Sequence, residues 1–212
     1  MVHEMVASRP NHAPIAPVPT ARGEERFLMY GVPWETYVHL RDALDEPGLR
    51  MTYLEGTLEL MSPSPEHELI KSMTGRLVEL YASERDVPLY AYGSTTFRRK
   101  LKARGLEPDE CYCLGAALNR YPDLAIEIVI SSGGIDKLAV YQGLGVREVW
   151  FWEDEAQAFR LYALRGSGYE QIDASTLMPG LDVAMLARFV TRTDQPQAVK
   201  EFRDHLRPPP HL

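Results

Sequence analysis

The sequence predicts an α/β domain in which a mixed β-sheet is flanked by helices, and three segments carry this prediction. Residues 65–84 repeat apolar side chains at helical spacing. Residues 108–131 form a candidate β-hairpin, and residues 122–152 follow the order strand, helix, strand. A hairpin is antiparallel whereas a strand–helix–strand unit is parallel, so the sheet is expected to be mixed. With 212 residues, 45% of them hydrophobic, the chain can bury one substantial core.

The two ends of the chain are expected to lie outside the main domain. Residues 1–25 hold four prolines and show no periodicity, which predicts a flexible N-terminal arm. The restriction of apolar periodicity to the middle of the chain predicts one domain over residues 26–192. Residues 193–212 then form a C-terminal helix and tail.

The first elements of the domain are a helix over residues 36–44 and a hairpin over residues 51–61 that turns at Glu55-Gly56. The next helix, residues 65–84, has Ser64 as its N-cap and Pro65 in its first position. Its apolar stripe consists of Leu69, Ile70, Met73, Leu77, Leu80 and Tyr81.

Glu66 lies on the same stripe, one turn before Leu69, so we expect it to point inward at the mouth of the core. The alternative is a first-turn acid that complements the helix dipole. His67 is ambiguous between helix capping and a role in a site.

The remaining elements follow from alternating apolar patterns and glycine stops. Strands are expected near residues 89–92, 94–103, 108–114 and 122–131, and a helix from 135 to 144 ends at Gly145. Strands over residues 146–152 and 158–164 pair with each other, and residues 181–190 and 196–206 form short helices.

Two carboxylates face each other if the candidate hairpin turns at Leu118, the middle of its connector. This register places Asp109 directly opposite Glu127, with Cβ atoms roughly 4.5–5.5 Å apart. Two carboxylates at this separation can hold one divalent cation, which prefers oxygen ligands. Asp123 shares the strand face but lies roughly 13 Å along the strand from Glu127.

Glu127 interrupts the apolar run Leu124–Ile130, which is typical of a strand buried on both faces. A buried carboxylate must be paired, protonated or bound to a metal. The alternative is that both acids lie on the surface of a half-exposed hairpin.

The net charge of −7 gives no sign of the overall basic excess that is usual in proteins binding nucleic acid tightly. Charge is uneven, however, because residues 97–104 contain five basic residues. A strand there would align on one face, along a phosphate backbone, the side chains of Arg98, Lys100, Lys102 and Arg104. The alternative is a solvated sheet edge protected by charge.

The two cysteines, Cys111 and Cys113, occupy same-face positions of one strand and are poorly placed to bond each other. Reduced thiols, no secretory signal and no long apolar run predict a cytoplasmic protein without a membrane segment. A C-x-C metal site is the alternative to two small core residues.

An inward acid on a helix, a hairpin with two acids and a crossover helix resemble the restriction-endonuclease-like fold of the PD-(D/E)XK nuclease superfamily. The chain is more closely similar to the Uma-two family over about residues 30–190. The matching segments are Tyr53–Ser64 with His67, Glu107–Cys111, Tyr121–Glu127, Ser132–Leu138 with Tyr141, and Leu144–Trp152.

This resemblance implies metal-assisted hydrolysis of phosphodiester bonds. Asp109, Glu127 and the main-chain carbonyl of Ile128 would ligate Mg²⁺ or Mn²⁺, and Glu66 could complete the ligand shell. The resemblance also implies that DNA is the substrate. Other nucleases of this fold imply a homodimer, in which two sites cut two strands.

The superfamily motif expects a lysine two residues after Glu127, where this chain has Val129. Lys137 is the expected replacement, because the family commonly moves this lysine to the following helix. It occupies the first turn, where a cation is disfavoured by the helix dipole, yet shares a face with Tyr141 and Leu144. We therefore expect Lys137 to have a negative partner, and the acid pair is the candidate. Alternatively, Asp136 neutralises the lysine locally, or the long lysine side chain extends to water.

The sequence thus predicts a Mg²⁺-dependent DNA endonuclease. Two alternatives remain open. The first is a member of the fold that binds nucleic acid or a partner without cutting. The second is a metal-dependent hydrolase of a small molecule, for which a closed or acidic pocket rather than a basic groove is expected over the acid pair.

Overall fold

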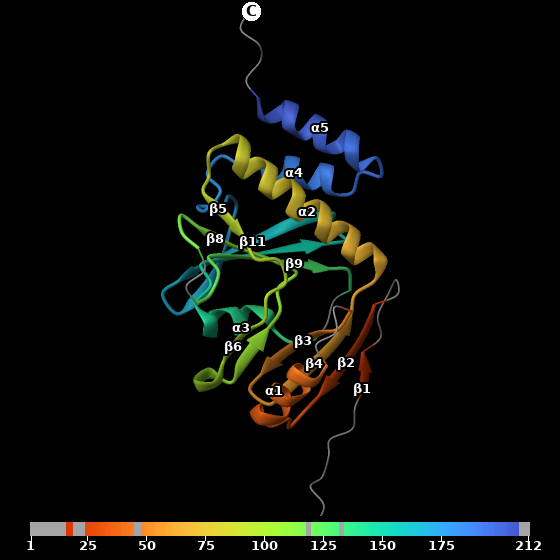
Figure 1. Ribbon diagram of the computed structural model, residues 1–212, viewed down its shortest axis with the longest axis vertical. Coiled ribbons are helices and arrows are strands. Elements are labelled where there is room, and N and C mark those ends of the chain that lie inside the picture. The colour runs from red at the N-terminus through yellow and green to blue at the C-terminus, as the bar shows by residue number, and fades with distance from the viewer. Residues whose placement is uncertain (1–15, 19–23, 45–47, 118–119, 132–133, 208–212) are drawn as a thin grey trace, which may run out of the picture.

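The computed structural model describes residues 16–18, 24–44, 48–117, 120–131 and 134–207, which include two six-stranded sheets with helices around them (Figure 1). One sheet, sheet B, is mixed and carries the predicted hairpin. The other, sheet A, is antiparallel throughout and was not predicted. The α/β class and the mixed sheet flanked by helices are confirmed.

Sheet B has the strand order β12-β11-β10-β9-β8-β5. Its strands are β5 (Leu89–Ala91), β8 (Glu110–Leu114), β9 (Leu124–Val129), β10 (Glu148–Glu153), β11 (Ala158–Arg165) and β12 (Gly168–Ile172). The pairing of β9 with β10 is parallel, and the crossover between them holds helix α3 (Lys137–Leu144). The predicted strand–helix–strand unit is therefore confirmed.

Sheet A has the order β1-β2-β4-β3-β7-β6. Its strands are β1 (Ala16–Val18), β2 (Glu25–Met29), β3 (Arg50–Leu54), β4 (Thr57–Ser62), β6 (Phe97–Arg99) and β7 (Arg104–Leu106). The β3–β4 hairpin turns at Glu55-Gly56 as predicted, and both residues have positive φ. Helix α1 (Trp34–Ala43) contributes Tyr37 to the core of this sheet.

Helices divide the molecule into layers (Figure 1). Helices α2 (Pro65–Glu84), α4 (Val183–Val190) and α5 (Gln195–Leu206) lie on one side of sheet B, and α3 lies on the other side, toward sheet A. Trp150 and Trp152 fill the first of these interfaces, and Val140 and Tyr141 the second. Residues 124–129 are thus covered on both sides, which explains their near-continuous apolar sequence.

The ends of the chain pack more closely than predicted. Residues 16–18 of the expected flexible arm form β1 and pair with β2, whereas residues 1–15 and 19–23 lie outside the described part of the chain. Helix α5 buries Ala198, Phe202 and Leu206 in the main core. The expected domain limits of 26 and 192 stay predictions.

The buried face of α2 is rotated from the predicted one. Leu69 is 45% exposed and Glu66 is exposed, so the inward orientation expected for Glu66 is wrong. The rest of the predicted stripe is largely confirmed, because Ile70, Met73, Leu77 and Tyr81 are buried, and His67 and Thr74 are buried with them. These polar inner residues gave no apolar signal, so the stripe was drawn too far toward Leu69 and Glu66.

The basic segment does not form the single strand that was predicted. The chain makes strand β6, a 3₁₀ turn at Lys100–Lys102 and strand β7, with Ala103 in the left-handed region. The pairing sets Arg99 opposite Arg104, so the four side chains cannot follow one strand face. Arg98 binds Asp42, Lys100 binds Glu35 and Arg104 binds Glu55. Their contact with phosphates stays a prediction whose single-strand geometry is wrong.

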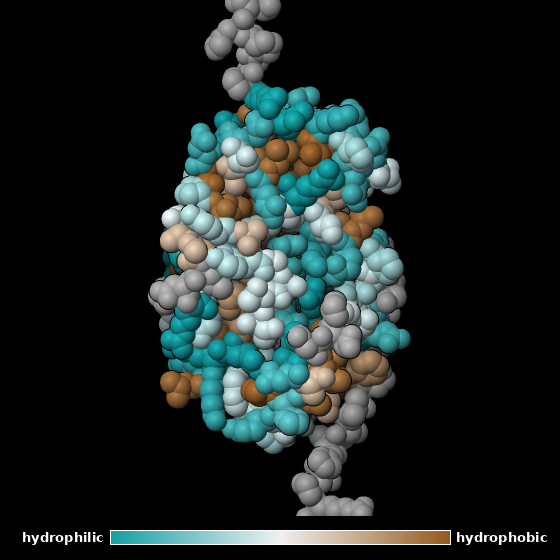
Figure 2. Space-filling view, viewed as in Figure 1, coloured by the Kyte–Doolittle hydropathy of each residue, from teal (hydrophilic) through white to brown (hydrophobic). Residues whose placement is uncertain are grey.

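The visible face of the molecule is mixed in hydropathy, and both cysteines are buried. On the face shown in Figure 2, hydrophobic residues form separate spots among hydrophilic ones. Cys111 and Cys113 are buried free thiols. Within the part of the chain that the structure describes, no helix combines the length and apolar composition needed to cross a membrane.

Candidate functional site

The β8–β9 pairing has the predicted register. Glu110 pairs with Ile126 and Cys111 with Ala125, so extending the ladder by one residue sets Asp109 opposite Glu127. Asp109 directly precedes β8 and is 1% exposed, and Glu127 in β9 is fully buried. Leu118, the predicted centre of the turn, lies outside the described residues.

Helix α3 supplies two partners to Glu127. Lys137 Nζ lies 2.6 Å from Glu127 Oε2, and the Tyr141 hydroxyl donates to Glu127 Oε1. Lys137 and Tyr141 are four residues apart and therefore share one helix face. Asp136 caps the helix by accepting from the Ala139 N–H, which fixes where Lys137 enters the first turn. The ammonium thus lies where the sequence placed it, against the acid pair.

Helix α2 supplies the main partner of Asp109. His67 Nε2 lies 2.9 Å from Asp109 Oδ1, and the N–H of Ile128 donates to Asp109 Oδ2 at 2.8 Å. Ser64 accepts from the His67 N–H at the start of the helix, so the cap fixes the imidazole at this position. His67 is fully buried.

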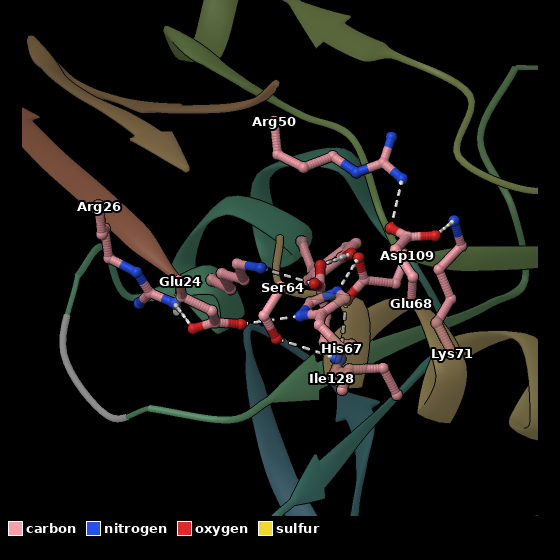
Figure 3. A network of polar contacts seen from close by, with 12 residues as sticks. Glu24, Arg26, Arg50, Ser64, His67, Glu68, Lys71, Asp109 and Ile128 are labelled. Carbon is pink, nitrogen blue, oxygen red and sulfur yellow. Dashed lines mark hydrogen bonds and ion pairs between the residues drawn. The ribbon is translucent and has the colours of Figure 1, made fainter. Parts of the chain in front are cut away.

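A second carboxylate binds the other side of the imidazole (Figure 3). Glu24 Oε1 lies 2.9 Å from His67 Nδ1, and Glu24 Oε2 accepts from the Ser131 hydroxyl at 2.8 Å. Arg26 bridges Glu24 to Glu59 of sheet A at 3.6 and 3.8 Å. The network joins sheet A and α2 to the strand ends of sheet B at the acid pair.

The acid pair and its partners shift one another's protonation. Burial alone would raise the pKa of Asp109, but the hydrogen bond and charge of His67 and the charge of Lys137 hold it below its usual range. Burial raises the pKa of Glu127; the attraction of Lys137 opposes this rise and repulsion by Asp109 adds to it. Burial would lower the pKa of Lys137, but Glu127 and Asp109 raise it. Asp109 is therefore the firmly ionised member of the pair.

Burial would lower the pKa of His67, but its hydrogen bonds and charge attraction with Asp109 and Glu24 raise it to about 9. Carboxylate oxygens accept hydrogen bonds only, so an imidazole between two of them donates from both nitrogens. His67 is an imidazolium between two anions.

Sequence reasoning missed three of these partners for different reasons. His67 is three residues after the Ser64 cap and three before Ile70, a spacing that could have indicated its inward position. Tyr141 was noted only as a neighbour of Lys137 on the helix face. Glu24 had no local signal, because it lies at the end of a segment without periodicity.

The donor set consists of carboxylate and carbonyl oxygens, which fit a hard divalent cation better than a soft metal that prefers thiolate ligands. In the described part of the chain, no group of three or more His, Cys, Asp or Glu side chains could hold a metal ion. Mg²⁺ is commonly bound by only one or two carboxylates with several waters. Each oxygen of Asp109 and Glu127 has one protein donor here and keeps a second lone pair. Two oxygen ligands at one place therefore suit Mg²⁺ or Mn²⁺.

Asp123 belongs to the opposite end of the hairpin. Its carboxylate accepts from the Leu114 N–H and pairs with Arg147 at 3.2 Å. It fastens the end of the hairpin that lies away from the acid pair, as the strand spacing predicted.

The charge of His67 predicts a pH-dependent stability. The folded-state pKa of His67, about 9, lies above the ordinary value of 6.5. The contribution of His67 to the free energy of unfolding is therefore fully present below about pH 6.5. Up to about 3 kcal/mol of the free energy of unfolding is then lost as pH rises through about 9. The urea concentration at the unfolding midpoint should decrease between about pH 6 and about pH 9.5, and this decrease should be larger in the wild type than in His67→Gln. The exposed His39→Gln is the control, and equal falls in wild type and His67→Gln would contradict the charge assignment.

Comparison with known proteins adds the family. A search of curated proteins found no match to this chain. The Uma2 family model, whose description is "Putative restriction endonuclease", matches residues 34–190. The match covers most of the chain, including α2, both strands of the acid pair and α3. The chain belongs to the Uma2 family of restriction-endonuclease-like proteins.

Proposed function

We propose that this protein is a Mg²⁺- or Mn²⁺-dependent endonuclease that hydrolyses phosphodiester bonds in DNA. The observation that carries the proposal is the meeting of Asp109, Glu127 and Lys137 at one buried point, from two strands and the following helix. Membership of the Uma2 family supports a nuclease rather than another hydrolase.

In this proposal Asp109, Glu127 and the main-chain carbonyl of Ile128 hold the metal ion. The bound ion would activate water and neutralise charge on the scissile phosphate. Lys137 approaches the same point from α3 and stabilises the negative charge that develops on the phosphate. Tyr141 fixes the carboxylate of Glu127, and His67 fixes that of Asp109, so both face the substrate already oriented.

The surroundings of the site hold positive side chains that are paired with acids. Arg26 lies near Glu24 and Glu59, and Arg50 and Lys71 both contact Glu68 (Figure 3). A DNA backbone that binds here would contact cations that also pair with acids. Each phosphate that these cations neutralise releases counterions, so we propose that the affinity for DNA decreases strongly with salt concentration. A homodimer, with two sites for two strands, remains part of the proposal.

Nicking of supercoiled plasmid by the purified full-length protein tests the function. Nicking should require Mn²⁺ or Mg²⁺ and disappear in Asp109→Asn. Asp123→Asn makes the same change on the same hairpin away from the site and should nick like the wild type. Metal-dependent DNA binding without nicking would support the non-cutting alternative. Neither binding nor nicking would direct the search to small phosphate esters.

Lys137→Ala should reduce plasmid nicking about 100-fold or more, because one electrostatic donor at the developing charge is removed. Its substitution also leaves Glu127 buried with one fewer donor, so the fold must be checked by circular dichroism. Lys200→Ala, which removes an exposed lysine from α5 on the far side of α2 from the acid pair, is the matched control. Wild-type nicking by Lys137→Ala would end the role of this lysine.

A further inference from the structure

A cavity of about 270 Å³ opens beside the acid pair. It shares two residues with the proposed metal site, Lys137 and Ile128. The side chain of Ile128 belongs to the core on the α2 side of sheet B, so its main chain is the part that faces the cavity. The other lining residues used below are Phe151, Glu153, Tyr162 and Arg26.

The cavity lies at the N-terminal end of α3. The eight residues of this helix span about 12 Å, and the cavity is bordered by the first residues of the helix and the segment before them. Phe151 is the parallel-strand partner of Glu127 and therefore lies on the same sheet face, one strand away. Phe151 and the neighbouring Tyr162 are half-buried, with ring centroids 5.8 Å apart at 83°. Two aromatic rings are thus left accessible beside the acid pair.

The lining suits one flat ring with polar edges. Aromatic side chains stack on any nucleobase, because every base has a π-face. The carboxylate of Glu153 can accept from a base amino group, and the cations of Arg26 and Lys137 can reach an adjacent phosphate. A base held in a duplex offers neither its face nor its pairing edge, so it must leave the helix before it can enter.

We propose that this cavity binds one unpaired nucleobase of the strand being cut, next to the scissile phosphate. The inference rests on the proposed nuclease function and narrows its substrate to single-stranded or locally unpaired DNA. Extruding a base from a duplex requires free energy for unpairing and unstacking, and this cost is least where the base is already unpaired. The cavity therefore makes unpaired DNA the preferred substrate.

Fluorescence anisotropy with Ca²⁺ in place of Mg²⁺ measures binding to three labelled oligonucleotides of one sequence. These are the single strand, its perfect duplex and the duplex with one unpaired base. The wild type should bind the first and third about tenfold or more tightly than the second. Equal affinity for all three would overturn the inference.

Variants assign the preference to the cavity. The two rings are nearly perpendicular, so one can stack on the base while the other meets its edge. Tyr162→Leu and Phe151→Leu should each weaken binding of the single strand about tenfold, because one of these aromatic contacts is lost, and leave duplex binding unchanged. Tyr162→Phe keeps the ring and should bind like the wild type. Tyr90→Leu removes a 44% exposed ring from β5 and is the surface control. If Phe151→Leu does not fold, the comparison of Tyr162→Leu with Tyr162→Phe tests the cavity, because Tyr162 is only half-buried.

The outcomes separate the cavity from the nuclease function. Metal-dependent plasmid nicking with no preference for unpaired bases would reject the cavity and keep the nuclease. A preference for unpaired DNA that Tyr162→Leu abolishes, without nicking by any form, would support the cavity and reject the nuclease. Binding of none of the three oligonucleotides would reject the inference.

Discussion

Glu127→Gln should remove metal-dependent DNA cleavage while leaving the protein folded. Glutamine keeps the size of the side chain and can still accept from Tyr141, but it loses the charge that would bind the metal and attracts Lys137. Loss of a residue that only supports a metal ligand typically costs 10–100-fold. Loss of the ligand itself should therefore cost at least about 100-fold in the rate of plasmid nicking.

The matched control for this variant is Glu110→Gln. Glu110 lies beside Asp109 on β8 but faces α2, where its carboxylate lies near Gly75. Burial raises the pKa of Glu110 to about 7, so at neutral pH the carboxyl group is about half protonated and glutamine removes only about half a charge there. Glu110→Gln should nick plasmid like the wild type. Unchanged nicking by Glu127→Gln would remove Glu127 from the mechanism, whatever the other variants do.

Glu148→Ala should destabilise the fold by about 3–5 kcal/mol without touching the acid pair. Glu148 is 1% exposed at the start of β10. One carboxylate oxygen accepts from the N–H and hydroxyl of Thr176 and the N–H of Leu177, the other from the Ser175 hydroxyl and Trp150 Nε1. Alanine leaves these donors without their acceptor, and a buried unsatisfied donor costs about 1–3 kcal/mol.

Urea unfolding at neutral pH measures this loss. A decrease of this size is a large share of the 5–15 kcal/mol that is typical of whole domains. Glu153 is half-buried on the same strand and forms an ion pair with the exposed Arg160, so Glu153→Ala should cost about 1 kcal/mol or less. If Glu148→Ala unfolds at the same urea concentration as Glu153→Ala, the anchoring role of Glu148 is wrong.

Glu148 shows that part of the segment resembling the family has a structural role. It belongs to the segment Leu144–Trp152, which carries much of the family resemblance. In the structure this segment contains the end of α3, Gly145 in the left-handed region and the anchor of residues 175–178. Gly145 and Glu148 of this segment therefore serve the construction of the fold, whereas Phe151 lines the cavity beside the acid pair.

The local elements were predictable where one physical signal dominated. Ser64 and Pro65 marked the start of α2, Gly145 marked the end of α3, and the apolar run around Glu127 marked a strand covered on both faces. The symmetric connector gave the β8–β9 register, because a one-residue slip would have moved Glu127 to the other face. These features depend on neighbouring residues and need no knowledge of the rest of the chain.

The second sheet and the orientation of α2 were not predictable in the same way. Strand β7 is three residues long and holds a glycine, and β3 pairs with it across about fifty residues of sequence. The face of α2 was decided by its neighbours, since Glu110 of β8 lies against Gly75. Periodicity alone selected Glu66, whereas packing turned His67 inward.

By itself, the sequence determined the acid pair, its register and the lysine on the following helix, because each depends on strand alternation or helical spacing over short distances. Only the tertiary structure decided what surrounds them. Glu24 reaches His67 across 43 residues, and His67 reaches Asp109 across 42. Likewise, Phe151 and Tyr162 come together with Lys137 in one cavity only when α3 packs beside the sheet. Contacts of this kind arise when separate layers close on one another, and no local pattern records them.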